Sequence, residues 1–280
     1  MRSDAMTPQG EPATVILAST TDLASRTLAD ALAEEGGFRS TGVNLLGQPV
    51  YQKGSLLLAR FEGMIVSPPN LDEYFNPQAY IFLSRHSADS GIASLTAHTT
   101  GNFSQEARFG GAGRELGRSD PALLKNYLRA LWGHRTEAEG YEIAMEATHH
   151  GPTSLQRPVL FVELGSTERH WGDRGAAGVV ARSLMESLAR REIWTKVAIG
   201  FGGTHYSEKF TKLLIEGDFA FSFVAPKYAL EHVDEGIVGQ MLQRTNAPVR
   251  YAVLDWKGLG AHKEKIVGLV RQFGLEEVRA

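Results

Sequence analysis

The sequence predicts an α/β protein of three layers, α/β/α, in which a mostly parallel mixed sheet lies between two layers of helices. Three observations lead to this class. The chain has 280 residues, of which 42% are hydrophobic and 22% charged, a balance typical of a globular protein that buries a full core. Its strand-like runs are continuously apolar, as in strands covered on both faces. They alternate with segments of helical periodicity, which favours a parallel sheet with helices on either side.

The N-terminal part divides into a tail and a β-α pair. Residues 1–12 are polar and rich in turn-forming residues, so we expect a disordered tail followed by a single α/β domain over 13–280. The β-rich run 13–20 precedes apolar residues at helical spacing, which end at Gly36 and Gly37, a strong helix stop. The domain therefore begins with a strand and a helix.

A region without helical periodicity follows at about 40–75. Two strands are expected within it, at 55–61 and 63–67, and their short separation indicates a hairpin. We expect this region to be a small β-rich insertion in the α/β domain.

Strands and helices then alternate to the end of the chain. A helix at 121–135 has Pro121 at its start and leucines along one face. The segment 86–119 is irregular and rich in Gly, Ser and Thr, and so long a loop is usually functional or mobile. Strands are expected at 79–85, 141–150, 158–166, 195–203, 219–224 and 249–256, and helices at 175–192, 207–217, 234–244 and 261–274.

Composition limits the classes of function. A formal charge of −3 argues against a protein that coats nucleic acid, so no DNA partner is expected and any RNA contact must be local. Basic residues at 108–135 suit such a contact, although a solvated helix face is the usual meaning of such a run. The chain has no cysteine, which excludes thiolate metal ligands. Without an apolar run of about 18 residues or a signal peptide, we expect a cytoplasmic protein without membrane contact.

Polar side chains gather at the ends of the predicted strands, where ligands bind in open α/β sheets. They are His86, Asp89 and Ser90 after 79–85, His149 and His150 at the end of 141–150, Glu163 in 158–166, and His205 after 195–203. We expect these residues to converge on one site.

Each candidate also has a structural interpretation. Adjacent strand residues point to opposite faces, so His149 and His150 can share a cavity only if the strand ends there, as Gly151 indicates. Otherwise they are histidines bonded to loop carbonyls. Glu163 interrupts an apolar run, where an unpaired buried carboxylate would be costly. It must therefore be ion-paired or bound to a metal, or its pKa must be raised. His86 with Asp89 fits a base with its orienting acid, or a loop that satisfies its own backbone.

The glycine-rich exit GFGGTHYSEKF places Gly202 and Gly203 before a predicted helix. Backbone N–H groups in that position can receive an anion, and a tight β-α turn is the alternative. The stretch matches neither GxGxxG nor a P-loop. GxSxG and HExxH are also absent, which argues against a serine hydrolase and an ordinary zinc protease.

Four motifs together resemble a known family. They are SRHSADSGIASLTAHTTGNF (84–103), EATHHGPT (146–153), FVELGSTERHW (161–171) and GFGGTHYSEKFT (200–211). In this order they are similar to the D-aminoacyl-tRNA deacylases of the archaeal and plant type, the second class of D-tyrosyl-tRNA deacylase. The resemblance extends over about residues 13–256.

The resemblance implies hydrolysis of the ester between a D-amino acid and the 3′-terminal ribose of tRNA, and removal of aldehyde-modified D-aminoacyl adducts. It also implies zinc and a fold akin to the phosphorylase and peptidyl-tRNA hydrolase type. We separately expect a monomer. A peptidase- or phosphorylase-like hydrolase of small substrates and a non-catalytic tRNA-binding protein are the competing classes.

Site residues follow from the motifs and the strand ends together. Ester hydrolysis needs an activated water and a stabilised oxyanion, and zinc on His and carboxylate ligands supplies both. Assistance by the vicinal 2′-OH with backbone donors is the alternative. Catalytic candidates are His86, His149, His150 and Glu163. Substrate-binding candidates are Ser87, Asp89, Ser90, Thr100, Asn102, Gly202, Gly203 and His205. A subset of His86, His98, His149, His150, Glu163 and His205 is expected to bind the metal.

Overall fold

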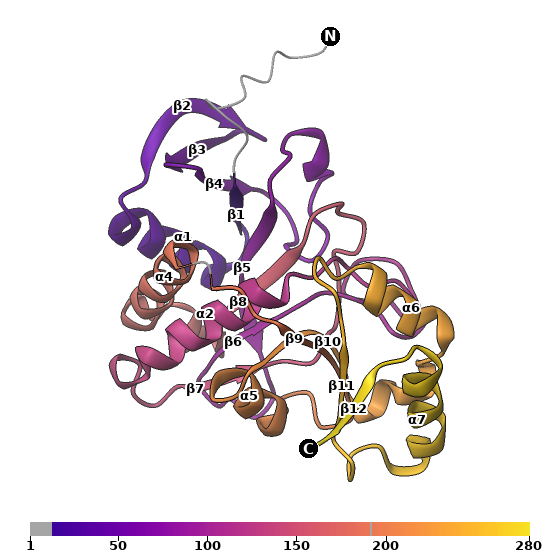
Figure 1. Cartoon of the computed structure of the whole chain (residues 1–280). Coiled ribbons are helices and arrows are strands. Elements are labelled where there is room, and N and C mark those ends of the chain that lie inside the picture. The colour runs from indigo at the N-terminus through magenta and orange to yellow at the C-terminus, as the bar shows by residue number, and fades with distance from the viewer. Residues whose placement is uncertain (1–12, 191) are drawn as a thin grey trace.

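The computed structural model describes residues 13–190 and 192–280, so the predicted disordered tail, 1–12, lies outside the described residues. Strands of the described chain form two sheets (Figure 1). One has eight strands in the order β2-β3-β4-β1-β5-β8-β6-β7, and the other has four in the order β10-β9-β11-β12. The predicted α/β class with a mostly parallel sheet is confirmed, and its strands are divided between these two sheets.

The large sheet has a parallel centre and antiparallel additions. β4, β1, β5 and β8 run parallel, whereas β6 runs antiparallel to β8 and parallel to β7. β2 and β3 extend the β4 edge as antiparallel strands within the region that was expected to be β-rich. The bounds are β1 Thr14–Ser19, β2 Arg39–Leu45, β3 Gln48–Lys53, β4 Leu56–Phe61, β5 Ala79–Ser87, β6 Ser94–His98, β7 Glu142–Met145 and β8 Val159–Ser166.

The small sheet is parallel throughout. Its strands are β9 Lys196–Phe201, β10 Phe219–Ala225, β11 Tyr251–Leu254 and β12 Glu276–Arg279. The helices are α1 Leu23–Gly36, α2 Pro121–Gly133, α3 Glu168–Trp171, α4 Arg174–Ala189, α5 Glu208–Ile215, α6 Glu235–Gln243 and α7 Lys263–Gln272. Asp22, Asp120, Asp173 and Asp234 cap α1, α2, α4 and α6 by accepting backbone N–H groups, the role that aspartate favours at helix starts.

The helices cover the two sheets unequally. α1, α4 and α2 lie side by side over one face of the large sheet, and one apolar core continues from them to α5 and the small sheet. α6 and α7 cover the other face of the small sheet (Figure 1). The other face of the large sheet packs against loops, through side chains such as Leu71 and Leu155. This face carries the polar cluster described below.

The structure differs from three expectations about strands. Residues 63–67 form bends and turns, and β4 pairs with β3 instead, because Gly63 has a positive φ and Met64 is 69% exposed. The segment 86–119 is not irregular throughout, since it contains the short buried strand β6. The strand expected at 141–150 ends at Met145, so the two histidines lie in a loop. The division into one domain stays a prediction.

No helix within residues 13–190 and 192–280 is long and apolar enough to cross a membrane.

His134 ties α2 to α4 and gives a first testable prediction. Its ring lies 2.9 Å from Glu186, and the neighbouring carboxylates raise the pKa of His134. Because the pKa of His134 is higher in the folded than in the unfolded protein, its protonation stabilises the fold. This stabilisation is complete at pH values below the unfolded pKa, near 6.5, and is lost as the pH rises through the folded pKa. We expect His134→Ala to lower the free energy of unfolding by less than about 1 kcal/mol, and only at low pH. Urea unfolding at pH 5.5 and pH 8.5 tests this, and an equal loss at both would contradict it.

Candidate active site

Alternate residues of three neighbouring strands form the floor of a polar cluster. Glu163 follows Phe161 by two positions on β8, so both side chains leave the loop-covered face of the large sheet. His98, the last residue of β6, is paired with Phe161, and His86 of β5 is paired with Gly165. The site therefore lies on a face of the sheet. A shared carboxyl edge was expected, but β6 runs antiparallel to β8, so these strands end at opposite edges.

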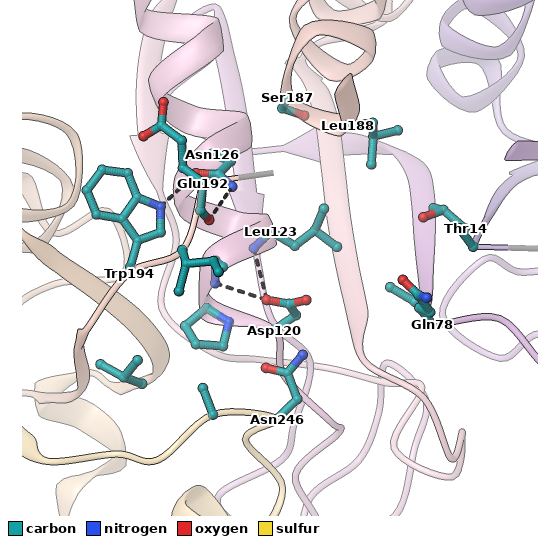
Figure 2. Close-up of a pocket in the computed structure, with 17 residues that line it drawn as sticks. Thr14, Gln78, Asp120, Leu123, Asn126, Ser187, Leu188, Glu192, Trp194 and Asn246 are labelled. Carbon is teal, nitrogen blue, oxygen red and sulfur yellow. Dashed lines mark hydrogen bonds between the residues drawn. The ribbon is translucent and has the colours of Figure 1, made fainter. Parts of the chain in front are cut away.

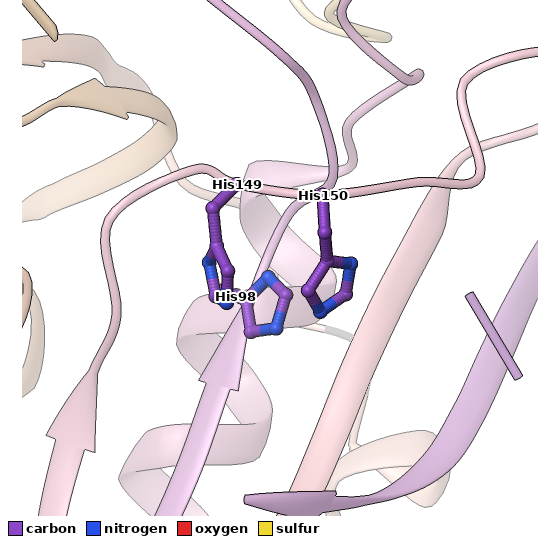
Figure 3. Close-up of side chains that lie close together, drawn as sticks. All are labelled: His98, His149 and His150. Carbon is purple, nitrogen blue, oxygen red and sulfur yellow. The ribbon is translucent and has the colours of Figure 1, made fainter. Parts of the chain in front are cut away.

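A loop from Glu146 to Gly151 crosses this floor. Thr148 fixes it, because its hydroxyl lies 3.0 Å from that of Thr99 and its N–H donates to the Val224 carbonyl of β10. His150 has a φ of +43°, a left-handed conformation that breaks the alternation of side-chain directions found in extended backbone. Adjacent His149 and His150 therefore both point at His98, as Figure 3 shows. Their ring centroids lie 4.1 and 4.7 Å from that of His98.

Backbone carbonyls fix the tautomers of these three histidines. The Nδ1 atoms of His98, His149 and His150 lie 3.1, 2.9 and 2.7 Å from the carbonyls of Thr99, Ala147 and Gly151. A carbonyl only accepts, so each Nδ1 donates and each Nε2 is left to bind another partner. One ligand atom from each ring lies within 4.8 Å of the others. This is the arrangement by which proteins orient histidine ligands to a metal.

A second group of buried side chains adjoins the histidines. His86 Nδ1 lies 3.1 Å from Glu146 Oε1 and 3.4 Å from Glu163 Oε2, and its Nε2 lies 3.1 Å from the Tyr206 hydroxyl. Burial disfavours a charged His86, but hydrogen bonds to the two carboxylates outweigh burial and raise the pKa of His86 to about 10. Burial likewise acts to raise the carboxyl pKa values, and the facing histidines outweigh it and hold the pKa of Glu146 and Glu163 below the usual value.

Glu146 also links the cluster to the solvent side. Its Oε2 lies 2.8 Å from His205 Nε2 and 3.8 Å from His149 Nε2, and His205 Nδ1 lies 2.9 Å from the hydroxyl of Tyr228. The side chains of His149 and His205 are 28% exposed, whereas those of His86, Glu146 and Glu163 are nearly inaccessible. A ligand that enters from solvent therefore contacts His149 and His205 before the buried carboxylates.

The three facing histidines differ in charge. Burial lowers the pKa of His98, but Glu163 outweighs burial, so the pKa of His98 is raised. Burial and the neighbouring His98 charge lower the pKa of His149, and they lower that of His150 to about 4. The site thus combines two histidines of raised pKa, His86 and His98, with two of lowered pKa, His149 and His150, beside ionised carboxylates.

Zinc fits the donor atoms present here. Among the described residues, His98 Nε2 is buried without a hydrogen bond, since the nearest carboxylate oxygen, of Glu163, lies 3.7 Å away, and such an orphan atom is costly unless another partner binds it. Imidazole nitrogen and carboxylate oxygen are ligands that zinc accepts in the absence of cysteine.

The structure brings together six of the residues expected at the site. Glu163 and five histidines form the cluster, namely His86, His98, His149, His150 and His205. Ser87 at the end of β5 is exposed, as are Asp89 and Ser90 after it. Thr100 and Asn102 are buried and bind backbone carbonyls of the surrounding loops. Gly202 and Gly203 make the tight turn after β9, at φ values of +96° and +77°, where a Cβ on Gly203 would meet Ser207. Thr100 also forms an isolated β-bridge with His149 of the cluster. A substrate-binding role for these seven residues stays a prediction.

Sequence reasoning missed Glu146, Tyr206 and Tyr228. Glu146 stands at the start of EATHHGPT, and a carboxylate directly after an apolar strand was the signal that should have selected it. Tyr206 follows His205, and an isolated β-bridge to Glu146 places it against the cluster. Nothing in the sequence marks Tyr228, which approaches through the distant 3-10 helix η3, Lys227–His232.

A separate cavity of about 280 Å³ lies near the N-terminal end of α2 (Figure 2). Asp120, Asn126 and Trp194 are among its lining residues, and the Trp194 indole donates to Asn126. It shares no residue with the polar cluster.

An α/β fold that places buried carboxylates beside partly exposed, tautomer-fixed histidines defines a hydrolase-like class of site, in which water and an electrophile can be held together. Sequence comparison narrows this class. The profile of the D-aminoacyl-tRNA deacylase family matches residues 73–278, and the chain belongs to this family.

Individual relatives agree with the profile. The D-aminoacyl-tRNA deacylase of Cenarchaeum symbiosum is 43% identical over 201 residues, covering 72% of this chain and 77% of the relative. That of Pyrococcus furiosus is 34% identical over 272 residues, covering 95% of this chain and 99% of the relative. A crystal structure of a conserved protein of unknown function has the same fold, with a TM-score of 0.88 at 29% identity, and the match covers 97% and 96% of the two chains.

Proposed function

We propose that the cluster of Glu146, Glu163 and the five histidines is where this D-aminoacyl-tRNA deacylase hydrolyses the ester between a D-amino acid and the terminal ribose of tRNA. The observation that carries this proposal is the convergence of His98, His149 and His150, each with its Nδ1 bound to a backbone carbonyl. Three oriented nitrogen donors beside two ionised carboxylates suit activation of water better than a structural role.

We further propose that His98, His149 and His150 hold a zinc ion. Bound zinc supplies a Lewis acid for the ester carbonyl and lowers the pKa of water. Of these rings, His149 has a side chain that is 28% exposed, and its Nε2 lies 3.8 Å from Glu146. Glu163 lies 3.7 Å from the Nε2 of His98, so it is placed to accept the proton that this nitrogen releases when it binds a metal.

His86 has a different role in this proposal. Its charged ring contacts both carboxylates and keeps two buried negative charges compatible at close range. Tyr206 fixes the other side of the ring. His86 therefore positions Glu146 and Glu163 and does not itself reach the ester, because it is buried beneath them.

Three further predictions accompany the proposed function. Because tRNA is charged and used in the cytoplasm, we place the reaction in that compartment. The monomeric state and the removal of aldehyde-modified D-aminoacyl groups also stay predictions.

Matched D- and L-aminoacyl-tRNAs, incubated with and without a chelator, test the reaction and the metal together. We expect release of the D-amino acid to exceed that of its L-isomer by at least about 100-fold, because a pocket built for one isomer must reject the other. Dialysis against chelator should abolish release, and added zinc should restore it.

Other outcomes separate the parts of the proposal. Equal release of both isomers would contradict chiral specificity. Full activity in protein shown by elemental analysis to be free of metal would contradict the zinc, and it would favour assistance by the vicinal 2′-OH.

A further inference from the structure

A hairpin-like loop stands directly beside the histidine cluster. Its two sides pair through the backbone: Asn102 N–H donates to the Glu115 carbonyl, and Arg114 N–H donates to the Ser104 carbonyl. Its tip is a turn closed by a hydrogen bond from Gly110 N–H to the Ala107 carbonyl. Residues 108 and 109, an arginine and a phenylalanine, occupy the two central positions of this turn.

The turn is rigidly joined to the site. Gly151 N–H donates to the Phe109 carbonyl at 3.0 Å, and the Gly151 carbonyl accepts from His150 Nδ1. A Cβ on Gly151 would lie 2.3 Å from Gly111 N, so the two segments touch backbone to backbone. The side-chain amide of Asn102 donates to the carbonyls of Gly110 and Ala112, which holds the tip from the other side.

This rigid turn presents an unburied aromatic ring. Phe109 is 70% exposed, although its own carbonyl is bound, and Met64 on the adjoining segment is 69% exposed. Contact between the two segments is close, since a Cβ on Gly110 would lie 2.1 Å from the Val66 carbonyl. Arg108 beside the ring has a 77% exposed side chain, with Glu106 3.5 Å away. An exposed ring and a guanidinium thus stand on the turn whose backbone is bound to Gly151, next to His150.

We propose that this turn binds the single-stranded 3′ end of the tRNA, with an unpaired base stacked on the Phe109 ring and a phosphate near Arg108. The proposal rests on the proposed function, because the ester must reach the histidines that Gly151 joins to the turn. Unpaired bases stack on exposed aromatic rings, and a nearby guanidinium attracts the backbone phosphates. A rigid platform loses little conformational entropy when such a ligand binds.

Phe109→Ala tests the stacking contact. Loss of one stacking platform costs about 1.4 kcal/mol, so we expect KM for D-aminoacyl-tRNA to rise about tenfold while kcat stays within about twofold. Phe109→Trp should restore KM. Ile193→Ala is the matched control, because Ile193 is 91% exposed and lies outside the polar cluster.

Binding without turnover separates this proposal from the proposed function. Fluorescence anisotropy with a labelled single-stranded RNA ending in CCA should show about tenfold weaker binding to Phe109→Ala, and wild-type affinity for Ile193→Ala. Arg108→Gln should reduce the slope of log affinity against log salt concentration by about the amount that one phosphate contact contributes. Wild-type binding and KM in Phe109→Ala would overturn the proposal. A wild-type enzyme that binds this RNA through Phe109 but releases no D-amino acid would contradict only the proposed function.

Discussion

Glu163→Gln is expected to lower kcat/KM for D-aminoacyl-tRNA by on the order of 10²–10⁴-fold, the range found when a proton-transfer group is removed. Glutamine keeps the shape of the side chain but has no charge and accepts no proton. Glu163 lies 3.4 Å from His86 Nδ1 and 3.7 Å from His98 Nε2, so its neutralisation leaves both rings without one of their partners. The pKa of His98 should then fall, because Glu163 is the largest influence that raises it.

Controls distinguish this effect from misfolding. Glu276→Gln changes an exposed glutamate of β12 in the same way and should leave kcat/KM unchanged. Glu163→Asp keeps the charge and should recover part of the activity that the glutamine variant loses. If circular dichroism shows that the Glu163→Gln protein is folded and its kcat/KM is near that of the wild type, Glu163 has no role in catalysis.

The elements that the sequence predicted well are those in which a single local pattern decides the structure. Continuous apolar runs identified β1, β5 and β8, and helical periodicity with Pro121 at the start identified α2. β6 was missed because Ser94–His98 is short and lies in a segment rich in Gly, Ser and Thr. Its strand conformation depends on pairing with β8 and β7, which local sequence does not reveal.

The sequence predicted the histidines and Glu163 as members of the site, but it did not predict how they are arranged. EATHHGPT indicated that the strand ends near the two histidines, and the structure confirms that both point the same way. Their common direction depends on the φ of His150 and on carbonyls from separate loops. The role of Glu146 depends on His86 and His205, which come from a strand and a turn far away in the sequence. Contacts of this kind arise only when the two sheets pack together.

His150→Ala is expected to remove bound zinc and to lower kcat/KM by at least about 100-fold, since loss of a ligand should exceed the 10–100-fold cost of losing an outer partner. Zinc content after dialysis is measured by elemental analysis, a readout that does not depend on activity. His262→Ala is the control, because His262 precedes α7 and makes no side-chain capping bond. Its zinc content and activity should equal those of the wild type.

The same variant separates the two interpretations of the paired histidines. If His150 is a structural ring held by the Gly151 carbonyl, its removal should lower the free energy of unfolding but leave zinc content unchanged. If His150 is a ligand, zinc should be lost under conditions in which the protein is still folded, and excess zinc should restore part of the activity by mass action. A folded His150→Ala protein with full zinc content would contradict the ligand role, and the metal would then have to be held by Glu146, His149 and His205, the other group at the solvent side whose ligand atoms lie within 4.8 Å.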